Sequence, residues 1–202
     1  METKRRISPL IPILIIIVIL LAILDIKFYS DKVKAEKAYK ELVEERQDAE
    51  KYQNNYNQLI TLMINDAALA EECGNLITNV WHNAIFAIAD EETNKYTMKN
   101  GEFVSDFNDA LSELFSDEEF STKMYDLSNN QSDVTSKMKR MTDPPDGYEE
   151  AYKALEDMYQ SYIKLTDTVI NCNGSLNSFN DDFINADYDV NDKYHVAELY
   201  AR

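Results

Sequence analysis

The segment Asn75–Asp90, NLITNVWHNAIFAIAD, holds the side chains of this chain that are best suited to chemistry. It contains the single tryptophan, Trp81, beside His82, one of two histidines. Imidazole titrates near neutral pH, so such a pair could bind a ligand or move a proton. On a helix with about 100° per residue, however, Trp81 falls within a broad apolar arc and His82 on the opposite half. The spacing therefore predicts a packed indole and a surface histidine. Phe86 interrupts the polar half and is the candidate contact for a partner.

The two cysteines, Cys73 and Cys172, are candidates for a disulfide bond in an oxidising compartment. Suppose that a first helix ends near Asp90 and that a second runs antiparallel to it for about 40 residues. A third helix that starts at Pro144 then begins at the same height along the bundle axis as about residue 50. Cys172 follows Pro144 by 172 − 144 = 28 residues, which places it level with about residue 78. A Cys73–Cys172 bond would stabilise the fold by about 2–4 kcal/mol. Two small, buried thiols in a helical core are the alternative.

A third candidate site lies near the C-terminus, in the segment DYDVNDKYHVAE. Four oxygen-bearing residues occupy positions 1, 3, 5 and 12 of a calcium-loop pattern, namely Asp187, Asp189, Asn191 and Glu198. The glycine that such a loop requires at position 6 is replaced by Asp192. Because the tail is rich in acidic residues, a chance match without any metal is the competing interpretation.

Four tyrosines of one predicted helix share a face and could stack sugars or peptides: Tyr148, Tyr152, Tyr159 and Tyr162. Thin bundles also bury tyrosines with their hydroxyls at the margin, and we favour that structural role. The sequence contains no nucleophile with a credible base, no phosphate-binding glycine loop and no paired cysteines or histidines at metal-ligand spacing. We therefore expect neither an enzyme nor a bound cofactor.

The first 26 residues predict a membrane anchor. A short basic tail, residues 1–6, precedes an apolar segment, 7–26, in which Ile7–Leu24 is 18 uncharged residues, or about 27 Å of helix. A cleaved signal peptide would have a shorter apolar region and a small-x-small exit. The basic tail favours a cytoplasmic N-terminus and an extracytoplasmic C-terminal domain, although five lysines between 27 and 40 reduce the charge difference across the membrane.

The composition limits the classes of partner and fold. Residues 27–202 carry 17 Lys and Arg against 35 Asp and Glu, a net charge of 17 − 35 = −18. Such a surface repels phosphate backbones, which excludes nucleic acid as an expected partner. With only four glycines and four prolines, the chain should form few, long elements.

A heptad pattern extends from about residue 35 to residue 88 without a proline. One set of positions is Ala35, Leu42, Ala49, Tyr56, Met63, Ala70, Ile77 and Ala84; the other is Ala38, Glu45, Tyr52, Leu59, Asp66, Cys73, Val80 and Ala87. The early positions are small or polar and bury little area. We therefore expect a helical stalk over 27–54 and a bundle over 55–190.

Two further helical regions complete the predicted bundle. The turn signal Asn100-Gly101 precedes the second helical region, and a capping box at Ser116–Glu119 lies within it. We expect this region to be one kinked helix or two collinear ones. The segment TDPPDGY begins the third. Asn173–Ser175 should break or cap it before the pattern runs on, and we expect the chain to fray over 191–202. The predicted fold is all-α: a transmembrane helix, a stalk and an up-down-up bundle of three long helices.

Three segments, CGNLITNVWHNAIF, DPPDGYEEAYKALEDMYQSY and NGSLNSFNDDF, together resemble a set of uncharacterised helical proteins, often membrane-anchored, of Gram-positive bacteria. The resemblance covers most of 55–190 and implies a shared fold and a bacterial surface location, but no activity. The leading hypothesis is a non-enzymatic, extracytoplasmic scaffold or interaction module of the cell envelope that binds a protein partner or itself. The alternatives are a ligand-sensing bundle with a separate signalling partner, and a cytoplasmic, spectrin-like organiser tethered to the membrane.

Overall fold

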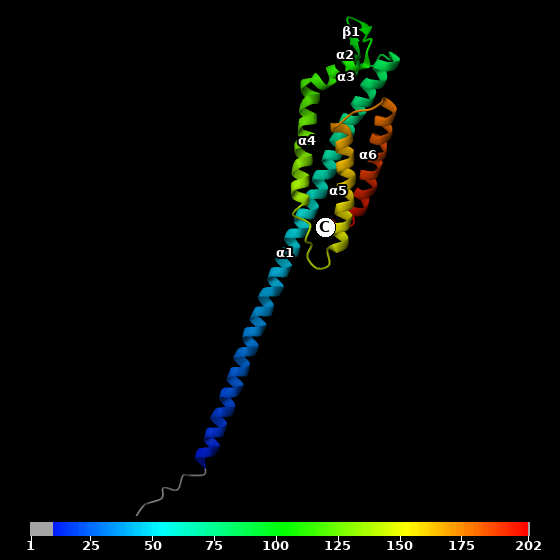
Figure 1. Ribbon diagram of the computed structural model, residues 1–202. Coiled ribbons are helices and arrows are strands. Elements are labelled where there is room, and N and C mark those ends of the chain that lie inside the picture. Colours follow the sequence, from blue (N-terminus) through cyan, green and yellow to red (C-terminus); the bar gives the residue numbers. More distant parts are fainter. Residues whose placement is uncertain (1–9, 202) are drawn as a thin grey trace, which may run out of the picture. The chain divides into compact units, whose positions relative to one another are not determined.

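The structure of the protein is a computed structural model that describes residues 10–201, and its regular secondary structure in that range is helical apart from one short hairpin (Figure 1). The helices are α1 (Leu10–Phe86), α2 (Asn94–Thr97), α3 (Phe107–Ser116), α4 (Glu118–Met138), α5 (Glu149–Ile170) and α6 (Leu176–Glu198). The strands are β1 (Met98–Lys99) and β2 (Glu102–Phe103). The predicted all-α class is confirmed. The chain divides into two compact units, before and after the Ala49–Glu50 boundary.

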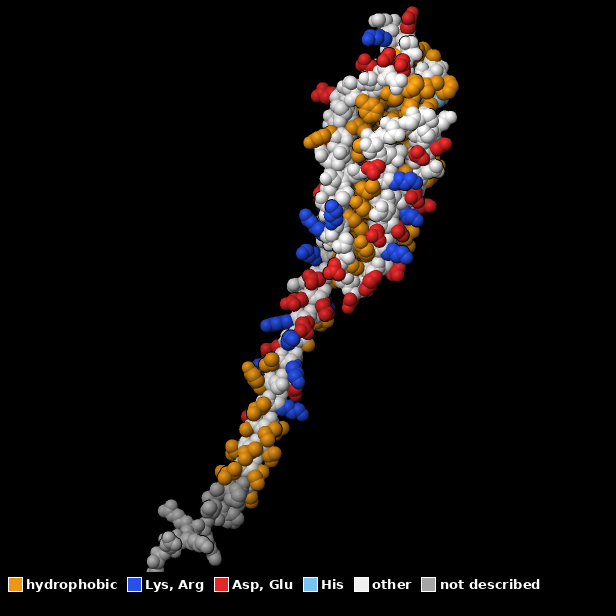
Figure 2. All heavy atoms as spheres, in the orientation of Figure 1, with side chains coloured by type: hydrophobic (Ala, Val, Ile, Leu, Met, Phe, Trp, Pro, Cys, Tyr) orange, Lys and Arg blue, Asp and Glu red, His pale blue; other side chains and the backbone are white. Residues whose placement is uncertain are grey.

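The first unit contains the apolar part of α1. Its most apolar 18-residue window has a mean hydropathy of 2.6, and none of that window is buried. Hydrophobic side chains cover this part of the helix on the visible face (Figure 2). Within residues 10–201, this is the one helix long and apolar enough to cross a membrane, as the sequence predicted.

In the second unit, α1 supplies the central seam of the core. Every heptad position from Tyr52 to Ala84 is buried: Tyr52, Tyr56, Leu59, Met63, Asp66, Ala70, Cys73, Ile77, Val80 and Ala84. The earlier positions Ala35, Leu42 and Glu45 are exposed. The seam is therefore covered within this chain only from Tyr52 onward.

The third predicted helix is in fact two antiparallel helices, α5 and α6. The α5 helix runs parallel to α1, since Tyr162 contacts Asp66 and Tyr148 packs on Tyr52. The direction of α6 is opposite, because the Tyr56 hydroxyl bonds the Ala197 carbonyl near its end, 2.9 Å away. Within the described residues of the second unit, α1, α4, α5 and α6 thus form an up-down-up-down bundle in place of the expected three-helix arrangement (Figure 1).

The reversal between α5 and α6 has a local cause. Gly174 adopts a φ of 89°, in the left-handed region that favours glycine. Ser175 then starts a new helix with a capping box, in which its side chain and that of Ser178 each accept the other residue's backbone N–H. The predicted fraying after residue 190 is also absent: α6 continues to Glu198, and Ala197 is fully buried against α1.

The second helical region bends between α3 and α4, so the two are not collinear (Figure 1). Asp117, rather than the predicted Ser116, caps α4 by accepting hydrogen bonds from the amides of Glu119 and Phe120, both at 3.1 Å. The predicted Asn100-Gly101 turn connects β1 to β2, with both residues at positive φ. The α5 helix begins at Glu149, later than the predicted start near Pro144.

Candidate functional site

Trp81 is buried and the adjacent His82 is exposed on α1, as the helical spacing predicted. The indole is 4% exposed, and its ring stacks on Phe107 at a centroid distance of 5.7 Å and packs on Phe179 at 6.1 Å. Among the described residues its Nε1 has no hydrogen-bond partner. His82 is exposed, and its ring lies 4.7 Å from that of Phe86. Trp81 is thus a core residue, and the two side chains do not form a joint site.

Phe86 lies at the end of α1 in an exposed apolar patch, the 85–88 patch. Phe86 is 60% exposed, Ile85 44% and Ile88 43%. Isolated exposed apolar residues are ordinary, whereas three within four positions are a candidate surface for a partner. Phe86 therefore stays the candidate contact residue.

Both cysteines are free thiols in the structure, Cys73 buried and Cys172 half-buried. Burial raises the pKa of each thiol to about 11, which leaves little thiolate at neutral pH and disfavours a nucleophilic role. The Cys73–Cys172 disulfide stays a prediction. Its test is the mass of the natively isolated protein with and without reductant.

The calcium-loop residues Asp187, Asp189, Asn191 and Glu198 all lie on α6. A continuous helix cannot wrap oxygen ligands around a cation as a loop does, so the loop geometry was wrongly predicted. Asp189 instead accepts a hydrogen bond from Ser161 on α5 at 2.8 Å. Within the part of the chain that the structure describes, no group of three or more His, Cys, Asp or Glu side chains could hold a metal ion.

Of the four predicted tyrosines, three contact neighbouring helices, and Tyr152 bonds within α5. Tyr148 packs edge-on against Tyr52, and the Tyr159 hydroxyl contacts that of Thr135 on α4 at 3.1 Å. Tyr152 is half-buried and donates to Glu156, while Tyr162 is fully buried. This arrangement agrees with the structural role that we favoured for them.

Sequence reasoning missed a buried carboxylate, Asp66, in the middle of the seam. It is 4% exposed and accepts hydrogen bonds from the Tyr162 hydroxyl (2.5 Å) and the Asn130 amide (2.8 Å). Burial raises the pKa of Asp66, and the two hydrogen bonds oppose that rise. A pocket of about 140 Å³ lies beside it, lined by Leu62, Asn65, Asp66, Leu69, Asn130, Asp133 and Val134. An acidic residue at a buried heptad position was the signal that could have revealed this network.

The raised pKa of Asp66 predicts a pH dependence that Asp66→Asn should remove. Between the ordinary value of 3.8 and the raised pKa, folded Asp66 holds a proton that the unfolded chain has lost. The contribution of Asp66 to the free energy of unfolding therefore falls as pH rises through that window, and it is fully present below the window. The free energy of unfolding of both proteins is measured in urea from neutral pH to about pH 4. As pH falls, the wild type should gain stability relative to Asp66→Asn. A difference that is constant or moves the other way would contradict the assignment.

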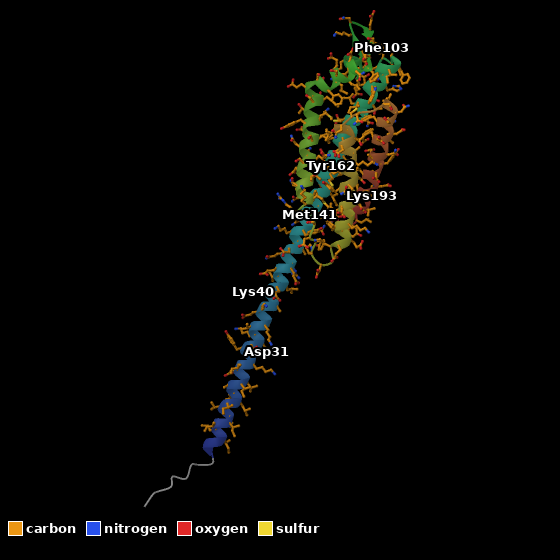
Figure 3. The ribbon with its side chains drawn as sticks, viewed as in Figure 1. Asp31, Lys40, Phe103, Met141, Tyr162 and Lys193 are labelled. Atoms are coloured by element: carbon orange, nitrogen blue, oxygen red, sulfur yellow. The ribbon has the colours of Figure 1, made fainter. Side chains whose placement is uncertain are left out.

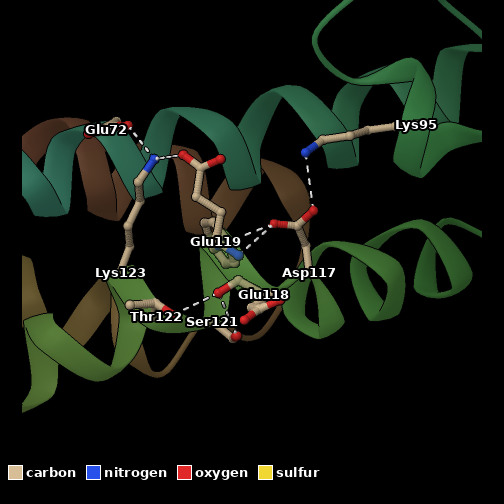
Figure 4. A network of polar contacts seen from close by, with 9 residues as sticks. Glu72, Lys95, Asp117, Glu118, Glu119, Ser121, Thr122 and Lys123 are labelled. Atoms are coloured by element: carbon tan, nitrogen blue, oxygen red, sulfur yellow. Dashed lines mark hydrogen bonds and ion pairs between the residues drawn. The ribbon is translucent and has the colours of Figure 1, made fainter.

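A larger, polar pocket of about 460 Å³ lies where α1, α2 and the start of α4 meet, around the ion pairs of Figure 4. Lys123 Nζ bonds Glu72 at 2.9 Å and Glu119 at 2.8 Å, and Lys95 Nζ bonds Asp117 at 3.1 Å. The lining residues are Glu72, Asn75, Leu76, Asn79, Glu92, Lys95, Tyr96, Asp117, Glu119, Phe120 and Lys123. Four carboxylates against two ammonium groups favour a polar ligand that carries positive charge.

Asp117 and Lys123 of this pocket are held in their charged forms. Hydrogen bonds from the Phe120 amide and from Lys95 lower the pKa of Asp117, and the carboxylates of Glu119 and Glu72 raise the pKa of Lys123. Neither group is therefore poised for proton transfer. The pocket has the chemistry of a binding site rather than of a general acid or base.

No known protein family, curated protein or solved structure matches this chain. The resemblance to helical proteins of Gram-positive bacteria accordingly stays a prediction.

Proposed function

We propose that this protein is a single-pass membrane protein whose helical bundle lies outside the cytoplasm and acts as a non-enzymatic scaffold or interaction module of the cell envelope. The observation that carries the proposal is the apolar part of α1, which is exposed throughout the 18-residue window and needs a hydrocarbon environment to cover it. The buried seam and the hydrogen-bonded tyrosines of the second unit suit a stable carrier of surfaces more than a catalytic cleft.

The 85–88 patch is the surface that we assign to a protein partner or to self-association. It combines an exposed phenylalanine with two isoleucines, and interface centres are enriched in such aromatic anchors. The rest of the second unit is strongly acidic. A partner docking here would therefore gain affinity from apolar burial and specificity from its own positive rim.

Photo-crosslinking in cells tests this assignment. A photoreactive residue is placed at Phe86 or, as the matched control, at Tyr125, an exposed aromatic residue of α4. We expect adducts to an envelope protein or to a second copy of the chain from position 86, at least about tenfold above those from position 125, because anchors concentrate at interface centres. No adduct at position 86, or equal yields at the two positions, would contradict the assignment.

The polar pocket supports a second candidate function, the sensing of a cationic ligand. The motivating observation is its four carboxylates around a volume of about 460 Å³. A ligand that binds the folded state raises the midpoint of thermal unfolding. A thermal-shift screen of amines and cationic peptides, repeated on Glu92→Gln, should find a shift that the variant reduces; no shift with any of them would weaken this candidate.

The third hypothesis reverses the topology and makes the bundle a cytoplasmic, spectrin-like organiser. The same anchor serves both orientations, so the side of the membrane on which the bundle lies separates the two.

A further inference from the structure

We propose that five lysines just beyond the apolar segment, the lysine collar, bind the anionic headgroups of the membrane that this segment crosses. The lysine collar consists of Lys27, Lys32, Lys34, Lys37 and Lys40. All five are exposed on the first unit's part of α1, where Figure 3 labels Lys40 and, between collar residues, Asp31. The inference rests on the proposed membrane anchoring and names the lipid class that the anchor would prefer.

The position of the collar along the helix puts its first three members within reach of the lipid headgroups. Lys27 follows Leu24 by three residues, so it lies about 4.5 Å beyond the last residue of the apolar run. Lys34 lies about 15 Å beyond it. The polar layer on each side of a bilayer is about 5–8 Å thick, and charges interact across a further 8 Å or so at physiological salt. Lysine side chains extend that reach, so the first three members of the collar lie within range of the lipid phosphates.

The distribution of the collar around the helix fits a membrane better than a protein. Successive members are five, two, three and three residues apart. At about 100° per residue, the three members within range of the phosphates span about 160° of the helix, and all five together leave no angular gap wider than about 140°. A docked protein would contact one side of a helix and would select a one-sided stripe. A helix that crosses a bilayer meets headgroups on all sides, which is the pattern that the collar matches.

The charge of this segment is opposite to that of the rest of the chain. Residues 27–40 carry five lysines against Asp31 and Glu36, a net charge of 5 − 2 = +3. Residues 41–202 carry 12 Lys and Arg against 33 Asp and Glu, or 12 − 33 = −21. Anionic lipids attract the first segment and repel the second. The collar is therefore the part of the C-terminal side that is suited to an anionic surface.

Neighbouring side chains leave the collar available. Lys32–Glu36 at 3.9 Å and Lys37–Glu41 at 3.5 Å are pairs in which both side chains are more than half exposed, and such pairs are weak enough for phosphate to compete. Phe28 and Tyr29 are exposed between the apolar run and most of the collar. Aromatic residues are enriched at this level of transmembrane helices, where their rings contact the headgroup region.

The test measures lipid selectivity of the full chain in phosphatidylcholine vesicles with trace spin-labelled lipid. The readout is the association constant of spin-labelled phosphatidylglycerol relative to phosphatidylcholine. The test variant changes all five collar lysines to Gln; the control changes Lys51, Lys99, Lys139, Lys153 and Lys164 to Gln, which are exposed and form no ion pair with another described residue. The two variants lose the same charge, and both retain the basic tail.

We expect the collar variant to reduce the selectivity at least about threefold, and the control to leave it within error, because each lysine near the surface contributes separately. Salt at about 1 M should reduce the wild-type value toward that of the collar variant. Full selectivity in the collar variant, or an equal loss in both variants, would overturn the inference. Flotation with the vesicles separates the two proposals: a chain that inserts without selectivity refutes the collar alone, and a chain that does not insert refutes the anchoring as well.

Discussion

Replacing Trp81 by Ala should lower the free energy of unfolding of the second unit by about 3–5 kcal/mol. The indole is almost fully buried and lies between Phe107 of α3 and Phe179 of α6. Its removal leaves a cavity at the contact of three helices, which the surrounding backbone can close only in part. Urea unfolding of the full chain, followed by circular dichroism, gives the change.

Phe86→Ala is the matched control for this prediction, since it removes another aromatic ring from the same helix five residues later. Its side chain is exposed, so the substitution should change the unfolding free energy by less than about 0.5 kcal/mol. Equal losses from the two variants, or a loss below about 1 kcal/mol for Trp81→Ala, would show that the indole is not part of the core.

Gly74→Ala should also destabilise the bundle, although alanine is the better helix former. A Cβ atom at Gly74 would meet the ring of Phe183 at 2.2 Å from Cε2, well inside van der Waals contact. At an open helix position the same change stabilises by about 1 kcal/mol. Here we expect a loss of about 1–3 kcal/mol, since α1 and α6 must separate or the ring must leave its rotamer.

A second substitution identifies the cause of that loss. In a Phe183→Ala background the ring is gone, so Gly74→Ala should become neutral or stabilising and reverse its sign. Unfolding of the four proteins of this double-mutant cycle gives the coupling energy between the two positions. If Gly74→Ala costs the same with and without the ring, α6 does not pack on α1 at this point.

Local patterns predicted the elements better than their arrangement. The heptad positions from Tyr52 to Ala84 are all buried, and the Asn100-Gly101 turn is a hairpin, because both features depend on residues close in sequence. The direction of α6 was missed because Asn173-Gly174-Ser175 marks the end of a helix without specifying the angle at which the next one leaves. Tertiary packing of Phe179 and Phe183 on α1 determines that angle.

The candidate sites show the same contrast between features that depend on residues close in sequence and features that depend on packing between distant segments. The apolar arc placed Trp81 in the core and His82 on the surface, whereas the Asp66–Tyr162 contact joins residues 96 positions apart. The polar pocket likewise combines α1, α2 and α4. The separate helical patterns give no information on which charged side chains converge, since that depends on how the helices are aligned along one another.

The most direct test of the proposed function is the side of the membrane on which the bundle lies. Ser105 is exposed in the second unit and Thr3 belongs to the basic tail, so Ser105→Cys and Thr3→Cys report the two sides. Intact cells are treated with an impermeant maleimide that shifts the protein on a gel, and the parent chain gives the background of the native thiols. We predict that position 105 is labelled in intact cells and position 3 only after lysis. The reverse pattern, or labelling of position 105 only after lysis, would contradict an extracytoplasmic bundle.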